Sequence, residues 1–562
     1  MSTVRRRLPR SCLLPLTLVL ACSDSTGDDE VGESSGIETT QTGSDAPEGE
    51  SADSVDTTVT QTDSGTETTA TDSGTGTTAT DSGTETTATD SGTETTATDS
   101  GTDSTDSTTG EPLTPCEEAE ANKSSVGCVY YAIDANNDPI ENFDTQPYAV
   151  VVSNVSGMAA NVEVQTRNGG VWTTVASQAV APGTLYQFDL ADRHINYTGV
   201  NVAGAYKIVS DVPIIAYQFQ PVNGQTSFTS DASLLLPSSV YDQYYWAVGW
   251  GEPSYGNAQI NIVAAQDDTH VTIKSSTATV AGGGIPALQA NVDYVYPNAM
   301  NEGDYLQIEA NNQFTGTYIT ADKPIAVFST HWCANVPIQN CCCDHLEEQV
   351  YGLQTWGKSY VASRLPIRNN GTPELTYWHL FAAENGTNVT FDAAVGVTGV
   401  PGAQVMNAGQ VLLLQIGGTA QNPGDFVVEA DKPIFMMQYM SSSANTNVAP
   451  AQAGDPAMTQ GVPTEQFRDD YVLLIPSNWV NDRLVITKPA NATITLDGAM
   501  IAPAMFTNIG TQGEWQVARV PAADGVHTLT GTAPFSVVVV GYDEYDSYAY
   551  PAGLDQVVIN PQ

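Results

Sequence analysis

The chain has 562 residues, and its 64 Asp and Glu against 18 Lys and Arg give a formal net charge of −46. Nucleic acid and anionic membrane surfaces are bound through basic patches, so this acidity argues against both as partners. The sequence contains no phosphate loop, dinucleotide fingerprint, zinc-helix motif or nucleophile elbow, so we expect no enzymatic activity, no cofactor and no metal.

The N-terminus has the pattern of a lipoprotein signal peptide, which we place at residues 1–21. A basic segment, Arg5–Arg10, precedes an apolar run that is too short to span a bilayer. The run ends in Val19-Leu-Ala-Cys22, which resembles a bacterial lipobox. We expect lipidation of Cys22, and because Ser23 rather than Asp follows it, an exported outer-membrane lipoprotein facing the cell surface or the periplasm. An ordinary secretory signal is the alternative.

Residues 22–115 form a low-complexity segment that is rich in Ser, Thr, Gly and acidic residues. Its nonapeptide Thr-Asp-Ser-Gly-Thr-Glu-Thr-Thr-Ala begins at Thr62 and recurs at Thr71, Thr80 and Thr89, with Gly76 in place of Glu in one copy. With almost no large apolar side chain, the segment cannot offset the entropy of ordering. We therefore expect a disordered, acidic stalk that holds a folded domain away from the membrane.

The folded part, 116–562, repeats one short strand four times. In each copy a proline precedes a run of consecutive apolar residues, which is typical of a strand that is covered on both faces. The copies recur at intervals of roughly 110 residues, which indicates an internal repeat. They are Asp211-Val-Pro-Ile-Ile-Ala-Tyr-Gln218, Asp322-Lys-Pro-Ile-Ala-Val-Phe-Ser329, Asp431-Lys-Pro-Ile-Phe-Met-Met-Gln438 and Thr532-Ala-Pro-Phe-Ser-Val-Val-Val539.

The remaining elements of each repeat are strands separated by Gly, Pro and Asn turns, which predicts an all-β fold. Each repeat opens with an aromatic strand, such as 130–133 or 244–248. We expect hairpins at 260–273 and 378–391, the second with an Asn385-Gly386 turn. Six or seven strands per repeat favour immunoglobulin-like β-sandwiches, with a β-propeller as the alternative. The predicted units are 116–230, 231–345, 346–455 and 456–562.

A loop with an aspartate at an equivalent position follows three of the repeated strands. The residues concerned are Asp231, Asp344 with its neighbour His345, and Asp455. One interpretation is local, because Asp accepts hydrogen bonds from nearby backbone N–H groups in turns and caps. The other makes these four residues a recognition surface, since long loops on rigid scaffolds carry binding.

The cysteines of the folded part predict disulfide bonds, because their number is even and the protein is expected to be exported. Cys116 and Cys128 close a short loop, and Cys333 is expected to pair within a cluster of three consecutive cysteines, Cys341, Cys342 and Cys343. A metal site formed by the cluster with His331 and His345 is the rival interpretation. It lacks the usual Cys-x-x-Cys spacing.

Two other patterns are compatible with cation binding but do not complete a known motif. Asp134-Ala-Asn-Asn-Asp138 begins like a calcium loop, but Pro139 and Thr145 stand where Gly and Glu are required. The other histidines are scattered among the predicted strands, and we expect them to be structural; they are His194, His270, His379 and His527.

Several motifs together resemble the N-terminal domain of the IgGFc-binding protein family. They are Asp231-Ala-Ser-Leu-Leu-Leu-Pro237, Asp268-Thr-His-Val-Thr-Ile273, Asp322-Lys-Pro-Ile-Ala-Val327, His331-Trp-Cys-Ala-Asn-Val-Pro337, Cys343-Asp-His-Leu-Glu-Glu-Gln349 and Trp356-Gly-Lys358. The resemblance implies a non-enzymatic extracellular binding or adhesion module. It does not imply antibody binding, because the bacterial relatives that this chain looks like are secreted or lipid-anchored proteins without an assigned ligand.

The sequence thus predicts a surface-displayed, lipid-anchored binding or adhesion protein whose ligand is an extracellular glycoprotein or matrix polysaccharide. The alternatives are a secreted hydrolase with an unrecognised carboxylate or metal site, and a structural envelope component that associates with itself. Bound metal or turnover of a glycan or peptide would favour the hydrolase. Concentration-dependent assembly would favour the structural component.

Overall fold

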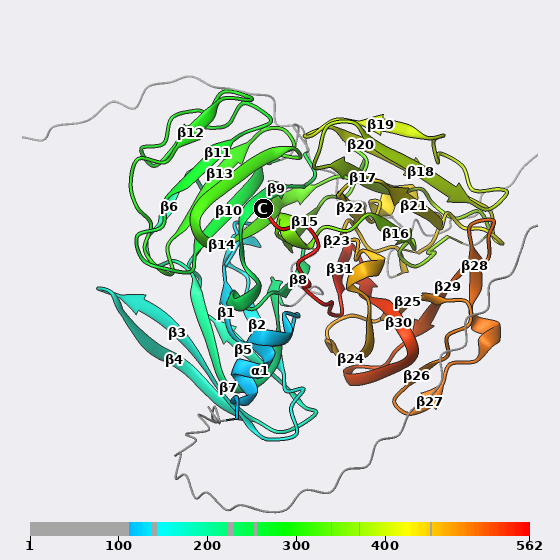
Figure 1. Ribbon diagram of the computed structural model, residues 1–562, viewed down its shortest axis with the longest axis horizontal. Helices are drawn as coiled ribbons and strands as arrows, with labels where there is room; N and C mark the ends of the chain where they lie inside the picture. Colours follow the sequence, from blue (N-terminus) through cyan, green and yellow to red (C-terminus); the bar gives the residue numbers. More distant parts are fainter. Residues whose placement is uncertain are drawn as a thin grey trace, which may run out of the picture. The chain divides into compact units, whose positions relative to one another are not determined.

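The computed structural model describes residues 112–137, 143–222, 229–251, 256–338, 340–369, 371–449 and 452–562. The expected signal peptide, Cys22 and nearly all of the expected stalk lie outside these ranges. Within them the chain is almost entirely β-structure, which confirms the predicted all-β class (Figure 1). The α-helix α1 (Pro115–Asn122) begins at a capping box between Thr114 and Glu117. In the described part, no helix is long and apolar enough to cross a membrane.

The first two units contain the strands β1 to β15. The strands of the first unit are β1 (Gly127–Ala132), β2 (Tyr148–Ser153), β3 (Ala160–Asn168), β4 (Val171–Val180), β5 (Leu185–Leu190), β6 (Gly199–Asn201), β7 (Tyr206–Gln220) and β8 (Asp231–Leu235). Those of the second are β9 (Asp242–Ala247), β10 (Ala258–Ala264), β11 (Val271–Lys274), β12 (Asp293–Val295), β13 (Tyr305–Ala310), β14 (Thr317–Ala334) and β15 (Asp344–Gln349).

The last two units contain the strands β16 to β31. The strands of the third unit are β16 (Ser359–Ala362), β17 (Thr376–Ala382), β18 (Thr387–Ala393), β19 (Gln404–Met406), β20 (Val411–Ile416), β21 (Phe426–Ala430), β22 (Ile434–Tyr439) and β23 (Met458–Gln460). Those of the fourth are β24 (Arg468–Ile475), β25 (Arg483–Pro489), β26 (Ile494–Leu496), β27 (Ala499–Met500), β28 (Thr507–Ile509), β29 (Trp515–Pro521), β30 (Gly525–Asp543) and β31 (Asp546–Pro551). Short 3₁₀ turns are η1 (Phe143–Thr145), η2 (Ser238–Val240), η3 (Leu353–Thr355), η4 (Ser443–Asn445), η6 (Thr464–Gln466) and η7 (Pro503–Met505).

The same pair of antiparallel sheets recurs in every unit. In the first unit the sheets have the orders β4-β3-β7-β1 and β5-β2-β7-β8, so the long strand β7 belongs to both. Strands β14 and β30 are shared in the same way in the second and fourth units, whereas β21 and β22 divide the role in the third. Because the sheets of a unit face each other across one core, each unit is a β-sandwich, as predicted.

The repeated proline marks the point at which the long strand passes from one sheet to the other. In β7 the residues up to Ser210 pair with β1 and β3, while those from Ile215 onward pair with β2 and β8. A proline fits this bend because it has no N–H to offer to either ladder. The equivalent bends lie at Pro213, Pro324, Pro433 and Pro534.

A buried tyrosine from the opening strand of each unit stabilises this bend. Its hydroxyl donates a hydrogen bond to the carbonyl of the residue after the proline, with O···O distances of 2.5 to 2.8 Å. A buried tyrosine hydroxyl needs such a partner, which explains why this residue opens each repeat. The pairs are Tyr130 with Ile214, Tyr245 with Ile325, Tyr360 with Ile434, and Tyr471 with Phe535.

The hairpins expected at 260–273 and 378–391 are wrong. Strands β10 and β11 each pair with a different half of β14, and β17 and β18 likewise pair with β22 and β21. The turn between the two strands therefore crosses from one sheet to the other. Gly386 has the positive φ of 66° that its turn requires, but the strands on either side of it are not partners.

The four sandwiches surround a common centre, where β8, β15, β23 and β31 lie next to one another (Figure 1). The ring closes where the chain ends, because Ser125 and Leu554 exchange backbone and side-chain hydrogen bonds.

Strand β6 pairs with β13 of the second unit. Since β8, β15 and β23 pair with the strand before them, the units end a few residues later than 230, 345 and 455.

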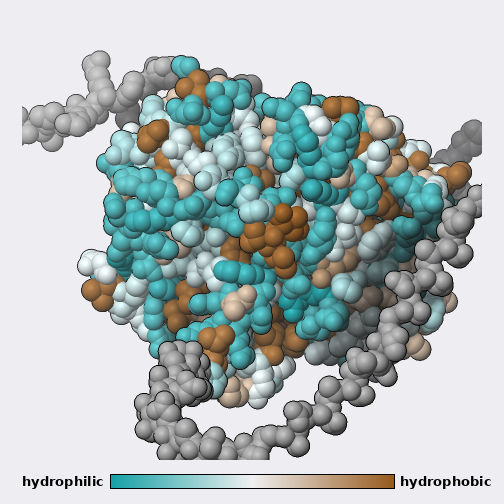
Figure 2. Space-filling model, viewed as in Figure 1, coloured by the Kyte–Doolittle hydropathy of each residue, from teal (hydrophilic) through white to brown (hydrophobic). Residues whose placement is uncertain are grey.

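Each sandwich buries aromatic and branched side chains between its sheets. In the third unit, Trp378 of one sheet packs against Phe426 of the other with ring centroids 5.8 Å apart. Figure 2 shows that hydrophilic residues predominate on the face in view and that hydrophobic ones form small, separate groups. Buried apolar side chains also connect the sandwiches, because one hydrophobic cluster contains residues of all four units.

Candidate functional site

An aspartate from each unit lies at the centre of the ring. Asp231, Asp344 and Asp546 begin β8, β15 and β31, and Asp455 precedes β23 by a few residues. All four side chains are fully buried. The sequence singled out three of these positions, and the fourth, Asp546, completes the set. We refer to these four residues as the hub aspartates.

Asp231 connects its own unit to the other three. Its Oδ1 accepts hydrogen bonds from the N–H groups of Ala232, at 2.9 Å, and Ala549, at 3.2 Å. Its Oδ2 accepts from the N–H groups of Glu347, at 3.2 Å, and Met458, at 3.0 Å. The four donors belong to β8, β31, β15 and the start of β23, so one carboxylate joins all four sandwiches.

The other hub aspartates make fewer contacts of the same kind. Asp344 accepts from the Ser547 N–H at 3.2 Å, and Asp546 accepts from the Ser230 hydroxyl at 2.6 Å. Burial raises the pKa of both carboxyl groups, and neighbouring hub carboxylates add to the effect. Oδ2 of Asp455 and Oδ2 of Asp546 are buried without a hydrogen bond.

Further titratable groups fill the space beside the hub. Burial lowers the pKa of His345 to about 3 and raises that of Glu347 to about 8, so the imidazole is neutral at pH 7. The His345 Nε2 and Glu347 Oε2 atoms are 3.9 Å apart. Glu348 accepts from the Gln460 N–H at 3.2 Å and from the Ser233 hydroxyl at 3.2 Å.

These positions correct the expectation of an exposed recognition surface. Asp231, Asp344, His345 and Asp455 are all buried, so none of them is presented on an accessible loop. Of the two interpretations drawn from the sequence, the structure supports the local one, since Asp231 and Asp344 each accept a hydrogen bond from the N–H of the next residue. What the sequence did not reveal is that Asp231 also bonds to three other units.

The cysteines of the folded part form three disulfides, which confirms the prediction of disulfide bonds. Cys116 bonds to Cys128, Cys333 to Cys343 and Cys341 to Cys342. The rival metal site loses its thiolate ligands, because a disulfide sulfur carries no negative charge to offer a metal ion. His331 and His345 remain as buried neutral imidazoles, and burial lowers the pKa of His331 to about 3.

We expect the stability of the folded domain to fall as the pH rises from 6.5 to 8.5. Burial raises the pKa of Asp134, Asp455 and Asp482 to about 7 and that of Glu347 to about 8. A carboxyl whose pKa is raised on folding contributes stability below its unfolded pKa and loses it as the pH passes the folded value. While the folded state holds one such proton that the unfolded state has lost, the free energy of unfolding falls by about 1.4 kcal/mol per pH unit.

Urea denaturation followed by tryptophan fluorescence at pH 6.5, 7.5 and 8.5 checks this. The buried histidines oppose this trend only at its start, because their folded pKa values of about 3 lie below the unfolded value of 6.5 and their contribution to stability is complete by about pH 7.5. A midpoint that stays constant or rises with pH would show that these carboxyl groups are not protonated in the folded state.

An open cleft of about 620 Å³ lies beside the point at which the ring closes. Its lining includes the apolar residues Val126, Met158 and Ile215 of the first unit and the charged residues Arg468 and Asp470 of the fourth. The volume is in the range of ligand pockets, and the mixture of apolar walls with a few charged groups is typical of them. This cleft could not be predicted, because its lining residues come from opposite ends of the folded part.

Comparison with known proteins assigns the family. The model of the IgGFc binding protein family matches residues 231–541, which is more than half of the chain. The chain belongs to the IgGFc-binding protein family. The match begins at the first hub aspartate and covers the second, third and nearly all of the fourth unit of this family member. The part of the first unit that precedes β8 lies outside the match, yet Tyr130 and Ile214 make the same contact at the bend as in the other three.

The chain is also similar to a curated human protein of the same family. It is 24% identical to the IgGFc-binding protein of Homo sapiens over 366 residues, which is 62% of this chain but 6% of the human protein. The family member described here therefore corresponds to a small part of that relative. No solved structure matches the chain significantly.

Proposed function

We propose that this chain is an exported binding protein that is anchored by a lipid at Cys22 in the outer membrane and acts without catalysis. The signal-like N-terminus with its lipobox supports the anchor, and the acidic, repetitive residues that follow support a spacer. The family name supports a binding role. The three disulfides of the folded domain are in keeping with an oxidising compartment.

We place the binding site in the cleft between the first and fourth units, and the mixed lining of this cleft is the observation that carries the proposal. Met158 is 55% exposed there, so the cleft offers an accessible apolar contact. Arg468 is held by Asp555 at 2.7 Å, which fixes a charged group in the same lining. An extracellular protein segment, bare or as part of a glycoprotein, fits an apolar wall combined with ordered charges.

Immobilised full-length chain, probed with glycoprotein and matrix-polysaccharide arrays that include purified IgG Fc, tests this proposal. We expect a protein or glycoprotein to be retained, and Met158→Asp to weaken its binding at least tenfold by placing a charge on the apolar wall. Met500→Asp is the matched control, because Met500 is 63% exposed on β27 and does not line the cleft. It should bind like the wild type.

Two outcomes would count against the proposal, in different ways. If the arrays retain nothing, the chain is not a binding protein for these ligand classes. If a ligand is retained and Met158→Asp binds it as well as Met500→Asp does, binding occurs at another surface. Retention of polysaccharide alone would replace the protein ligand by a carbohydrate one.

A further inference from the structure

Three segments of the first sandwich bring acidic groups around one histidine. Asp134 follows β1, Asp192 and His194 follow β5, and Asp144 lies in η1 just before β2. Strands β2 and β5 are paired, with Tyr148 opposite Leu190, so their ends meet at one edge of the sandwich. Neither the hub nor the cleft includes any of these residues.

The side chains of Asp134, Asp192 and His194 point their ligand atoms at one another. Nδ1 of His194 lies 2.7 Å from Asp192 Oδ1 and 3.9 Å from Asp134 Oδ2. One ligand atom from each of the three residues lies within 4.8 Å of the others. Two atoms that each lie about 2 Å from one ion are at most about 4 Å apart, and both His194 separations are below that limit.

The histidine supplies a second, independent observation. Its side chain is only 10% exposed, and Nδ1 is buried without making a hydrogen bond. The contact of 2.7 Å with Asp192 therefore lacks hydrogen-bond geometry, although the two atoms are close enough for one. A buried imidazole nitrogen that is directed at two carboxylates and bonded to neither has the arrangement of a metal ligand.

The surrounding contacts hold the three groups in place. Asp134 Oδ2 accepts the N–H groups of Arg193, at 2.6 Å, and His194, at 3.1 Å, which fixes the loop after β5 against the end of β1. On the other side of the imidazole ring, Nε2 of His194 lies 3.9 Å from Asp144 Oδ2. Metal-binding histidines commonly have a carboxylate near the second nitrogen, because it fixes the ring orientation and the tautomer.

We propose that Asp134, Asp192 and His194 form a binding site for a divalent transition-metal ion of the zinc class. Two carboxylates and one imidazole are ligands of Zn²⁺ and Mn²⁺, whereas Ca²⁺ prefers oxygen ligands alone. A dication offsets the repulsion between the carboxylates at the point where they are closest. Asp192 is 52% exposed, so the ion has a route from solvent and can keep a water molecule or a partner's ligand.

Binding requires the ligands to be deprotonated. Zinc therefore competes with protons for these three side chains. The ion would connect the segments after β1 and β5 and stabilise the first sandwich by mass action.

Equilibrium dialysis of the full chain against Zn²⁺ in excess Mg²⁺ tests the site, because Mg²⁺ occupies the weak carboxylate sites that an acidic chain offers. We expect one tightly bound zinc ion per wild-type chain, and at least tenfold weaker binding in both Asp192→Asn and His194→Gln. Asp189→Asn is the matched control, since Asp189 is exposed on β5 and the substitution changes the net charge equally. It should bind zinc like the wild type.

X-ray absorption at the zinc edge provides a readout besides affinity. We expect the scattering pattern of one imidazole in the wild-type spectrum and its loss in His194→Gln. Equal zinc binding by wild type, Asp192→Asn and Asp189→Asn would overturn the proposal, as would wild-type zinc without an imidazole ligand. Because the side chain of Asp192 is half exposed, Asp192→Asn is expected to fold, and thermal denaturation of the metal-free protein checks this.

Discussion

Replacing Asp231 by alanine is expected to lower the free energy of unfolding by about 4 kcal/mol or more, because each of four buried N–H groups that loses its acceptor costs about 1–3 kcal/mol. The donors are spread over all four sandwiches, so the substitution loosens every junction at the hub at once. Small proteins are typically stable by only about 5–15 kcal/mol. We therefore expect poor yield of the soluble variant and a much lower urea midpoint.

Urea denaturation of Asp231→Ala, followed by both tryptophan fluorescence and circular dichroism, measures this effect. Asp231→Asn should be intermediate, because the amide keeps one acceptor oxygen but turns its NH₂ group toward two backbone donors. Asp293→Ala is the control, since Asp293 is exposed on β12 and its loss should change stability by less than about 0.5 kcal/mol. If Asp231→Ala unfolds at the same urea concentration as Asp293→Ala, the hub does not hold the units together.

The repeated strand could be predicted because its signals are local. Proline fixes its own backbone and that of its neighbour, and the apolar run after it needs cover on both faces, so four copies predicted four equivalent units. The tyrosines of the opening strands were visible for the same reason. Their partners, the carbonyls next to the prolines, could not be identified from the sequence, because any carbonyl can accept a hydrogen bond.

The hub could not be predicted, because its contacts join distant parts of the chain. Asp231 and Ala549 are 318 residues apart, and no pattern near either residue indicates the other. The same limit explains the wrong hairpins, since the Asn385-Gly386 turn looks the same whether the strands beside it pair or separate. His194 was taken as structural because Asp134, which completes the cluster with the nearby Asp192, comes from a segment 60 residues earlier.

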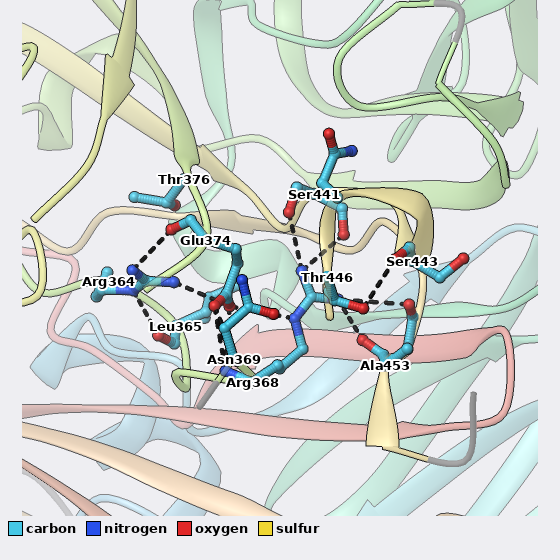
Figure 3. A network of polar contacts seen from close by, with 12 residues as sticks. Arg364, Leu365, Arg368, Asn369, Glu374, Thr376, Ser441, Ser443, Thr446 and Ala453 are labelled. Atoms are coloured by element: carbon cyan, nitrogen blue, oxygen red, sulfur yellow. Dashed lines mark hydrogen bonds and ion pairs between the residues drawn. The ribbon is translucent and has the colours of Figure 1, made fainter. Parts of the chain in front are cut away.

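A second feature that the sequence analysis missed is a buried ion-pair network in the third unit (Figure 3). Glu374 forms an ion pair with Arg364 at 2.9 Å and accepts a hydrogen bond from Arg368 at 3.3 Å, and all three side chains are at most 2% exposed. Arg368 also donates to the Ser441 carbonyl at 2.7 Å and to the carbonyl of Ala453. The network therefore connects the segment 364–374 to the loop that precedes β23.

Replacing Glu374 by alanine is expected to destabilise the domain by about 3–5 kcal/mol, since it leaves two buried guanidinium groups without their carboxylate. Glu374→Gln should cost less, because the amide keeps an acceptor of nearly the same shape. Glu384→Ala is the matched control, since Glu384 is 56% exposed and lies 3.8 Å from Lys432. An exposed pair of this kind contributes about 0–1 kcal/mol.

The charge of Glu374 also gives the effect a distinctive pH dependence. Burial raises its pKa, but Arg364 and Arg368 outweigh that and hold it below the usual value of 4.5. A carboxyl whose pKa is lowered on folding contributes stability above its unfolded pKa and loses it as the pH falls through the folded value. The gap in urea midpoint between wild type and Glu374→Gln should therefore be wide at pH 6 and narrow below pH 4. A gap that does not change with pH would mean that the glutamate acts through its shape and hydrogen bonds rather than through its charge.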